Sequence, residues 1–168
     1  MGKIMGSWSG MRKCLEEEML ANSLRGRVRW NCTKFAGMDG ASAFEVYVDD
    51  ALVKRFSMET VAVAAGDASL SDGRRDMKRF WENYWQQKKL PLASRREFDD
   101  EDFALALWEY RCLDVQQAIQ SDDPLVRMFA VLDRRIGKRT LEKLSGDVEA
   151  QPEWLRIFYN LRMQAEGI

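Results

Sequence analysis

Three short segments between residues 27 and 57 constrain the fold more than any other part of the sequence, because apolar and polar side chains alternate along each of them. The two-residue period runs through RVRWNCTKF (27–35), SAFEVYVD (42–49) and ALVKRFS (51–57), as expected of half-buried strands. Turn sequences separate them, GMDG (37–40) and Asp49-Asp50. Consecutive strands joined by tight turns pair antiparallel and bury one face. The sequence therefore predicts a three-stranded antiparallel meander.

Helical periodicity dominates the rest of the chain. Apolar residues recur at three- and four-residue spacings before the meander and in several segments after it, namely 8–24, then 58–65, 71–89, 99–112, 124–135, 138–144 and from 152 onward. The expected fold class is α+β: an N-terminal helix and three-stranded antiparallel meander, followed by a five- to six-helix C-terminal region. No linker rich in Gly, Ser or Pro divides the chain. We therefore expect residues 1–168 to form a single domain, in which the helical portion 58–168 packs on the helix and β-meander of 8–57.

The composition excludes several classes of function. The chain has no histidine, which removes Ser–His and Cys–His catalytic pairs and His-containing metal sites. Its 26 basic and 27 acidic residues give a net charge of −1, so no general attraction to nucleic acid or anionic lipid is built in. Three widely spaced cysteines, Cys14, Cys32 and Cys112, favour buried, reduced thiols in a cytoplasmic protein. No apolar stretch approaches the ~18 residues of a membrane span. We expect no catalytic residue, no metal site, no cofactor and no membrane association.

Paired acids and clustered aromatic residues have local explanations. Asp49-Asp50 lies in a predicted turn, and the acids at 99–102 and 122–123 lie at predicted helix starts, where carboxylates complement the helix dipole. Asp99 has the position of an N-cap, between Phe98 and Phe103 as a hydrophobic staple requires. Trp81, Tyr84 and Trp85 recur at helical spacing, which indicates core positions. We interpret these residues as structural.

Basic and aromatic side chains gather on the polar face of the predicted meander, namely Arg27, Arg29, Tyr47 and Arg55. Such a face can bind single-stranded nucleic acid by phosphate contacts and stacking. Glu45 and Asp49 share it, however, and opposite charges across strands are a routine way to solvate a sheet. Nucleic-acid binding is therefore the alternative hypothesis, with Lys138 and Arg139 as a second group of cations.

The segment VLDRRIGKRTLEKL (131–144) joins two predicted helices. Arg134 and Arg135 suit the end of the first helix, and Gly137 suits a left-handed cap. Asp133 does not fit, because it lies at the negative end of its helix with no cation three or four residues away. A buried carboxylate must then find a partner elsewhere. We predict a structural clasp between Asp133 and an arginine distant in the sequence, with candidates at Arg25, Arg27 and Arg162.

Several motifs carry a resemblance to known proteins: WSGMRK near the start, SLRGRV at the beginning of the first strand, LDRRIGKRTL between two helices and FYNLR near the C-terminus. The sequence resembles a family of small uncharacterised bacterial proteins that share a WS-x-[LM]-R-K start, an SLRGRV segment and an LDRR-x-GKR-x-L segment. The resemblance implies a bacterial, cytoplasmic protein, and it supplies no activity, cofactor or catalytic residue.

These observations favour a non-enzymatic cytoplasmic binding or interaction module, whose partner is another protein or a second copy of the chain. The alternative is a nucleic-acid-binding protein that uses Arg27, Arg29 and Arg55 together with the basic cluster 134–139. A third hypothesis is an enzyme that works through carboxylates or lysine, for which a deep pocket lined by two close acids would be the evidence. A continuous positive face would favour the alternative, whereas an exposed apolar patch would favour a protein partner.

Overall fold

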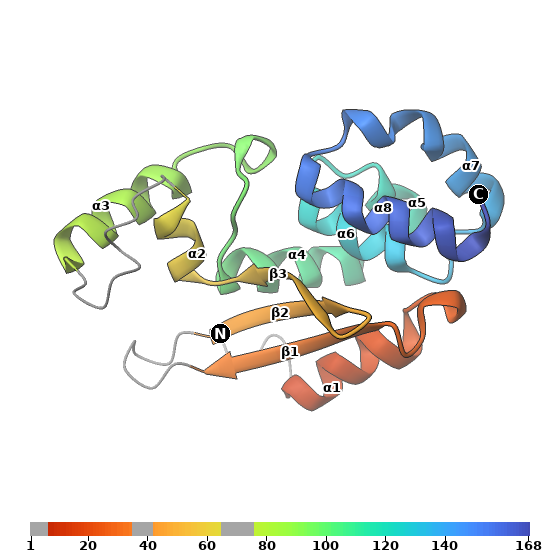
Figure 1. Ribbon diagram of the computed structural model, residues 1–168, viewed down its shortest axis with the longest axis horizontal. Coiled ribbons are helices and arrows are strands. Elements are labelled where there is room, and N and C mark those ends of the chain that lie inside the picture. The colour runs from red at the N-terminus through yellow and green to blue at the C-terminus, as the bar shows by residue number, and fades with distance from the viewer. Residues whose placement is uncertain (1–6, 35–41, 65–75) are drawn as a thin grey trace.

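The computed structural model describes residues 7–34, 42–64 and 76–168, and it combines one small sheet with many helices (Figure 1). Helix α1 (Trp8–Lys13) and a π-helical turn (Cys14–Glu18) precede strands β1 (Val28–Lys34), β2 (Ser42–Val48) and β3 (Ala51–Phe56). Seven α-helices follow within the described residues: α2 (Met58–Val63), α3 (Met77–Lys88), α4 (Asp100–Cys112), α5 (Val115–Ile119), α6 (Pro124–Leu132), α7 (Lys138–Leu144) and α8 (Glu153–Glu166). The predicted α+β class is confirmed, with one helix more than expected.

The sheet is the predicted meander. Its strand order is β1-β2-β3, and both pairs are antiparallel. Asp49 and Asp50 form the turn between β2 and β3 with φ values of 49° and 67°. Tight hairpin turns favour such positive values, and aspartate tolerates them better than most residues do. The predicted turn at 37–40 lies outside the described residues.

One face of the sheet packs on α4 and α6, and Phe103 of α4 lies at the centre of this contact. Its ring centroid is 4.3 Å from that of Phe44, 5.1 Å from that of Phe56 and 5.3 Å from that of Phe129. Aromatic pairs of this kind add about 0.5–1.5 kcal/mol each beyond the area that they bury. The surrounding cluster of buried residues, which we call the main core, extends from Met11 to Met163. The sheet and the C-terminal helices therefore share one apolar interior.

The N-terminal segment is not the single helix predicted over 8–24. After the π-helical turn the chain becomes irregular, and the backbone of residues 19–21 pairs with that of residues 132–134 through N–H···O bonds of 2.8 and 2.9 Å. Glu16 reaches the sheet, where its carboxylate accepts a 2.7 Å hydrogen bond from the backbone N–H of Trp30. These long-range bonds override the local helical pattern. The bond to Glu16 also satisfies the backbone N–H of Trp30, which lies on the edge strand β1.

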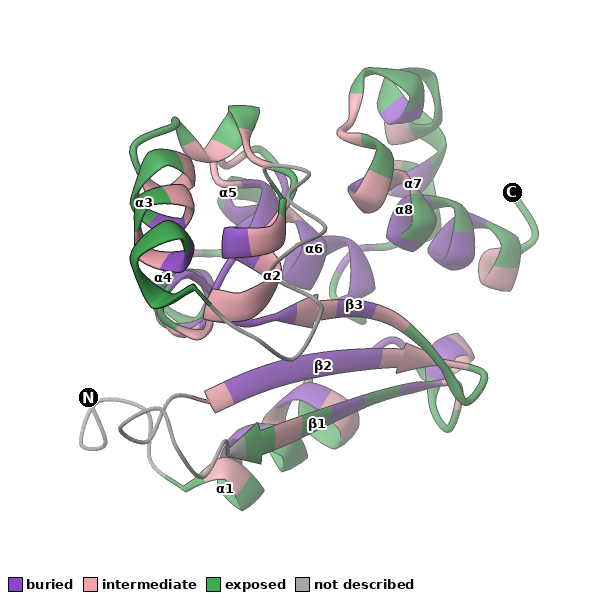
Figure 2. Ribbon diagram, turned by 60° about the vertical axis from the view of Figure 1, so that its left-hand side comes forward, coloured by how far each residue is buried: buried purple, intermediate pink, exposed green. Residues whose placement is uncertain are grey.

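Helices α2 and α3 form a hairpin at one end of the molecule, away from α7 and α8 (Figures 1 and 2). The hairpin has an apolar cluster of its own, which we call the satellite cluster. Its buried members are Val61, Ala62, Phe80 and Tyr84. The hairpin thus buries its apolar residues mainly against itself, and its attachment to the main core needs a separate explanation.

One predicted helix end and one predicted cap differ in the structure, whereas α4 ends at Cys112 as predicted. Helix α6 stops at Leu132 rather than at 135, because Asp133 is extended (φ −73°, ψ 135°) and takes part in the pairing with residues 19–21. Leu113 is also extended and separates α5 from α4. Gly137 does not adopt the predicted left-handed conformation, since its φ is −83° and it is the N-cap of α7. Among the described residues no helix combines the length and the apolar character that a membrane crossing requires.

Candidate functional site

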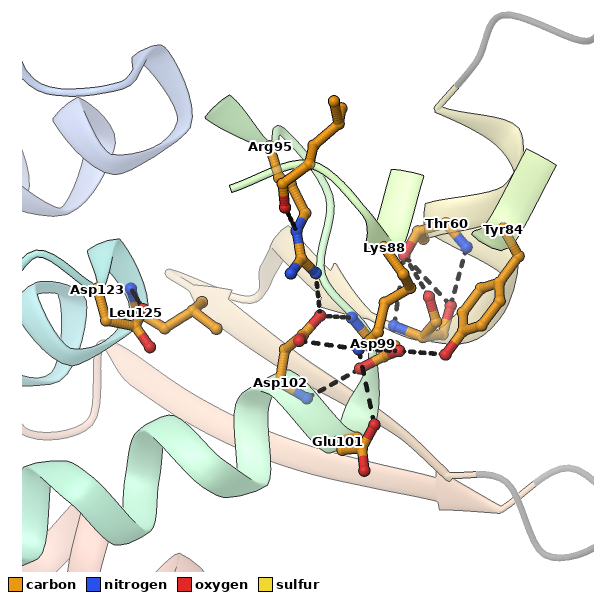
Figure 3. Close-up of polar contacts among 11 residues, drawn as sticks. Thr60, Tyr84, Lys88, Arg95, Asp99, Glu101, Asp102, Asp123 and Leu125 are labelled. Carbon is orange, nitrogen blue, oxygen red and sulfur yellow. Dashed lines mark hydrogen bonds and ion pairs between the residues drawn. The ribbon is translucent and has the colours of Figure 1, made fainter. Parts of the chain in front are cut away.

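Five charged or phenolic side chains meet where the α2–α3 hairpin joins α4 (Figure 3). We call this set the α3–α4 ion cluster, and it consists of Tyr84 and Lys88 from α3, Arg95 from the following loop, and Asp99 and Asp102 at the start of α4. The sequence dictates the position of the two acids. Asp99 is the predicted N-cap of α4, and its side chain accepts a 2.8 Å bond from the Asp102 N–H, while Asp102 accepts a 3.1 Å bond from the Asp99 N–H. This reciprocal capping box holds both carboxylates against α3.

Lys88 bridges the two carboxylates. Its Nζ lies 2.9 Å from Asp99 Oδ2 and 2.9 Å from Asp102 Oδ1. The hydroxyl of Tyr84 donates a 2.6 Å hydrogen bond to Asp99 Oδ2, and Arg95 Nη1 lies 3.1 Å from Asp102 Oδ2. Asp99 is completely buried and Asp102 nearly so. Each carboxylate therefore has cationic or phenolic donors in addition to a backbone N–H, as buried acids require.

The surroundings shift the protonation equilibria of this cluster in different directions. For Asp99, burial raises the pKa, but the bonds from Tyr84, the Asp102 backbone and Lys88 outweigh burial and bring the pKa below its usual value. For Asp102, burial and the neighbouring Asp99 charge raise the pKa despite the contact with Lys88. Burial and the bond to Asp99 raise the pKa of Tyr84. At neutral pH the phenol therefore keeps its proton as a donor to Asp99.

The α3–α4 ion cluster holds its lysine as a charged bridge between two carboxylates. Lys88, the one amine of the cluster, is held between two carboxylates and has a raised pKa, because its bonds to Asp102 and Asp99 outweigh its burial. A nucleophilic lysine requires a lowered pKa instead. Within the described part of the chain, no three acids or cysteines are grouped so that they could hold a metal ion. The cluster attaches the α2–α3 hairpin to α4, together with a backbone bond of 3.1 Å from the Ser57 N–H to the Phe98 carbonyl.

Asp133 is buried, with 1% of its surface exposed, and it does form a clasp. The partners differ from those predicted. Tyr110 of α4 donates a hydrogen bond to Asp133 Oδ2, Arg135 Nη2 lies 2.6 Å from the same oxygen, and the Arg135 backbone N–H donates a 2.8 Å bond to Oδ1. The prediction of a distant arginine assumed that Asp133 is helical. Because Asp133 is extended, its side chain turns back to the residue two positions later.

The other residues predicted for the clasp bind elsewhere. Arg25 Nη2 donates a 2.7 Å bond to the Glu17 carbonyl. Arg162 is buried and donates bonds to the Ile136 carbonyl (2.9 Å), to the Ser23 hydroxyl (3.0 Å) and to the carboxylate of Glu166. It therefore secures the segment after Asp133 rather than Asp133 itself. Lys138 and Arg139 are exposed, and Lys138 Nζ lies 3.2 Å from the Glu166 carbonyl oxygen.

The three arginines proposed for nucleic-acid binding each have a carboxylate beside them. Arg27 binds Asp49 through two bonds of 2.9 and 2.7 Å, Arg29 binds Asp50, and Arg55 Nε lies 3.7 Å from Glu45 Oε1. The bond to Asp49 raises the pKa of Arg27, and the same bond lowers the pKa of Asp49. The polar face of the sheet thus carries alternating charge and not a continuous positive field.

An open groove of about 720 Å³ lies between the π-helical turn and the start of β1. Its lining combines cations and acids, namely Lys13, Glu16, Glu17, Glu18, Arg25 and Arg29, with Gly26 and Val28 between them. Glu16 already binds the backbone of β1, and Arg25 already binds the Glu17 carbonyl. The balance of charge gives this groove no preference for an anion or a cation.

Helices α3 and α4 expose large apolar side chains, none of which was predicted to lie on the surface. On α4 these are Leu105 and Trp108, exposed by 57% and 52%, and on α3 they are Met77 and Trp85, exposed by 46% and 55%. We call these four residues the α3–α4 apolar surface. Trp85 was expected in the core and is not there, because Phe80 and Tyr84 occupy the buried side of α3. The sequence of α4 did contain an indication of exposed apolar side chains, because FALALWEY is apolar on more sides than a half-buried helix needs.

The sequence model of the SF0329 protein family matches residues 7–163, which is nearly the whole chain, so the chain belongs to this family. The match agrees with the resemblance to an uncharacterised family. No curated protein and no solved structure matches the sequence.

Proposed function

We propose that this member of the SF0329 protein family is a non-enzymatic interaction module that binds a protein partner through the α3–α4 apolar surface. The observation that carries the proposal is the exposure of two tryptophans, Trp85 and Trp108, each by more than half. Exposed apolar side chains that lie together mark interaction sites more often than other parts of the surface do, and Leu105 and Trp108 lie one turn apart on α4. Tryptophan is also enriched among the residues that dominate binding energy at protein interfaces.

The buried acids support a non-enzymatic role. Glu45, Asp99, Asp102 and Asp133 are buried, and each accepts hydrogen bonds from neighbouring groups of the chain. A catalytic carboxylate needs an open side from which a substrate can approach it. These four carboxylates instead tie helices and strands together.

The pairing of the sheet arginines supports a protein partner over nucleic acid. A protein that binds phosphates has cations that are free to release counterions from the nucleic-acid backbone. Arg27, Arg29 and Arg55 each face a carboxylate of the same sheet, which a phosphate would have to displace. A protein partner can contact the exposed apolar side chains on α3 and α4 without displacing a carboxylate from them.

We place the module in the bacterial cytoplasm as part of the same proposal. Cys14, Cys32 and Cys112 form no disulfide in the described part of the chain, and Cys112 is exposed at the end of α4 rather than buried as expected. Exposed free thiols persist in a reducing compartment and are oxidised or paired elsewhere. The position of Cys112, one turn beyond Trp108, therefore supports a cytoplasmic partner for this helix face.

Photo-crosslinking tests the proposal in the cells that produce the protein. A photoreactive phenylalanine derivative at position 105 is expected to capture a protein, since Leu105 lies on the α3–α4 apolar surface. The matched control is position 157, because Ile157 is also an exposed apolar residue (46%) but belongs to α8. Capture at position 105 should disappear when Trp108→Ser is added to the same chain. Equal capture at both positions, or none at position 105, would show that the surface has no partner.

A further inference from the structure

We draw no further inference here: the strongest candidate, the open groove between the π-helical turn and the start of β1, carries nothing because its cations and acids balance and nothing in the structure shows what would occupy it.

Discussion

The main core and the α2–α3 hairpin are held in place by different forces. The main core buries residues from the sheet and from most of the helices around Phe103, so its apolar contacts reach across the whole chain. The satellite cluster has four buried residues, and ion pairs rather than apolar side chains join it to α4. Helices of 6 and 12 residues are marginal on their own. The hairpin should therefore open at a lower free energy than the main core does.

The largest expected effect comes from the clasp inside the main core. Asp133→Ala removes the acceptor of Tyr110 and leaves the Arg135 guanidinium without its carboxylate. The Tyr110 hydroxyl and the Arg135 backbone N–H then lose their acceptor inside the protein, whereas the Arg135 guanidinium, which is 46% exposed, can turn to water. Two unsatisfied groups correspond to a loss of about 3 kcal/mol in the free energy of unfolding. Urea denaturation measures it. Arg134→Ala, an exposed neighbour, is the control and should change the value by less than about 0.5 kcal/mol. A similar loss in both variants would mean that the segment and not the clasp carries the stability.

A smaller and more local effect is expected at the α3–α4 ion cluster. Lys88→Met leaves Asp99 and Asp102 side by side without their shared cation. Hydrogen exchange of the amides of α2 and α3 should then accelerate by roughly tenfold to a hundredfold. This corresponds to a decrease of ~1.4–2.8 kcal/mol in the free energy of opening the hairpin. Amides of α6 and α8 should change much less. Lys89→Met, at the exposed next position, is the matched control. Equal acceleration in all helices would show that the hairpin and the main core open together.

Alkaline titration compares the two regions through Tyr84 and Tyr110. Burial raises the pKa of both phenols, and the bond to Asp99 or the charge of Asp133 adds to it. A raised pKa in the folded state stabilises the protein fully below the unfolded value of 10.0, and this contribution is lost as the pH rises above that value. Because the hairpin opens more easily, Tyr84 should ionise at a lower pH than Tyr110. When the pH is raised, the tyrosinate absorbance of the Tyr84→Phe variant should lack the ionisation step at lower pH. The absorbance of the Tyr110→Phe variant should lack the step at higher pH. The reverse order would contradict the ranking of the two regions.

The sequence predicts those features that depend on neighbouring residues. A two-residue period is enough to predict the meander, and the Phe98-Asp99 sequence is enough to predict the N-cap of α4. The partners of Asp99 were not predictable, because Tyr84 and Lys88 reach it through a tertiary contact that no local period encodes. For these acids the interpretation as structural agrees with the contacts, but the attachment of the hairpin was missed.

The error at Asp133 has a different origin. The predicted helix was three residues too long, and a helical Asp133 would have had no partner nearby. The true end of α6 depends on backbone pairing with residues 19–21, more than a hundred positions earlier in the chain. A local pattern cannot register such pairing. The sequence showed only that a buried Asp133 would need a partner, and its contact with Arg135 required the correct helix end.

The smallest effect is expected on the exposed side of the sheet. Arg27→Ala removes two bonds to Asp49, which are as short as those of the Asp133 clasp. Both side chains are well exposed, so water replaces the bonds and salt screens the charges. The urea midpoint should therefore not change measurably, at low or at high salt. A clear loss at low salt that disappears at high salt would mean that the pair supports the β2–β3 turn electrostatically. The contrast with Asp133→Ala then separates burial from bond length as the source of stability, because the two pairs have similar distances and differ mainly in their access to water.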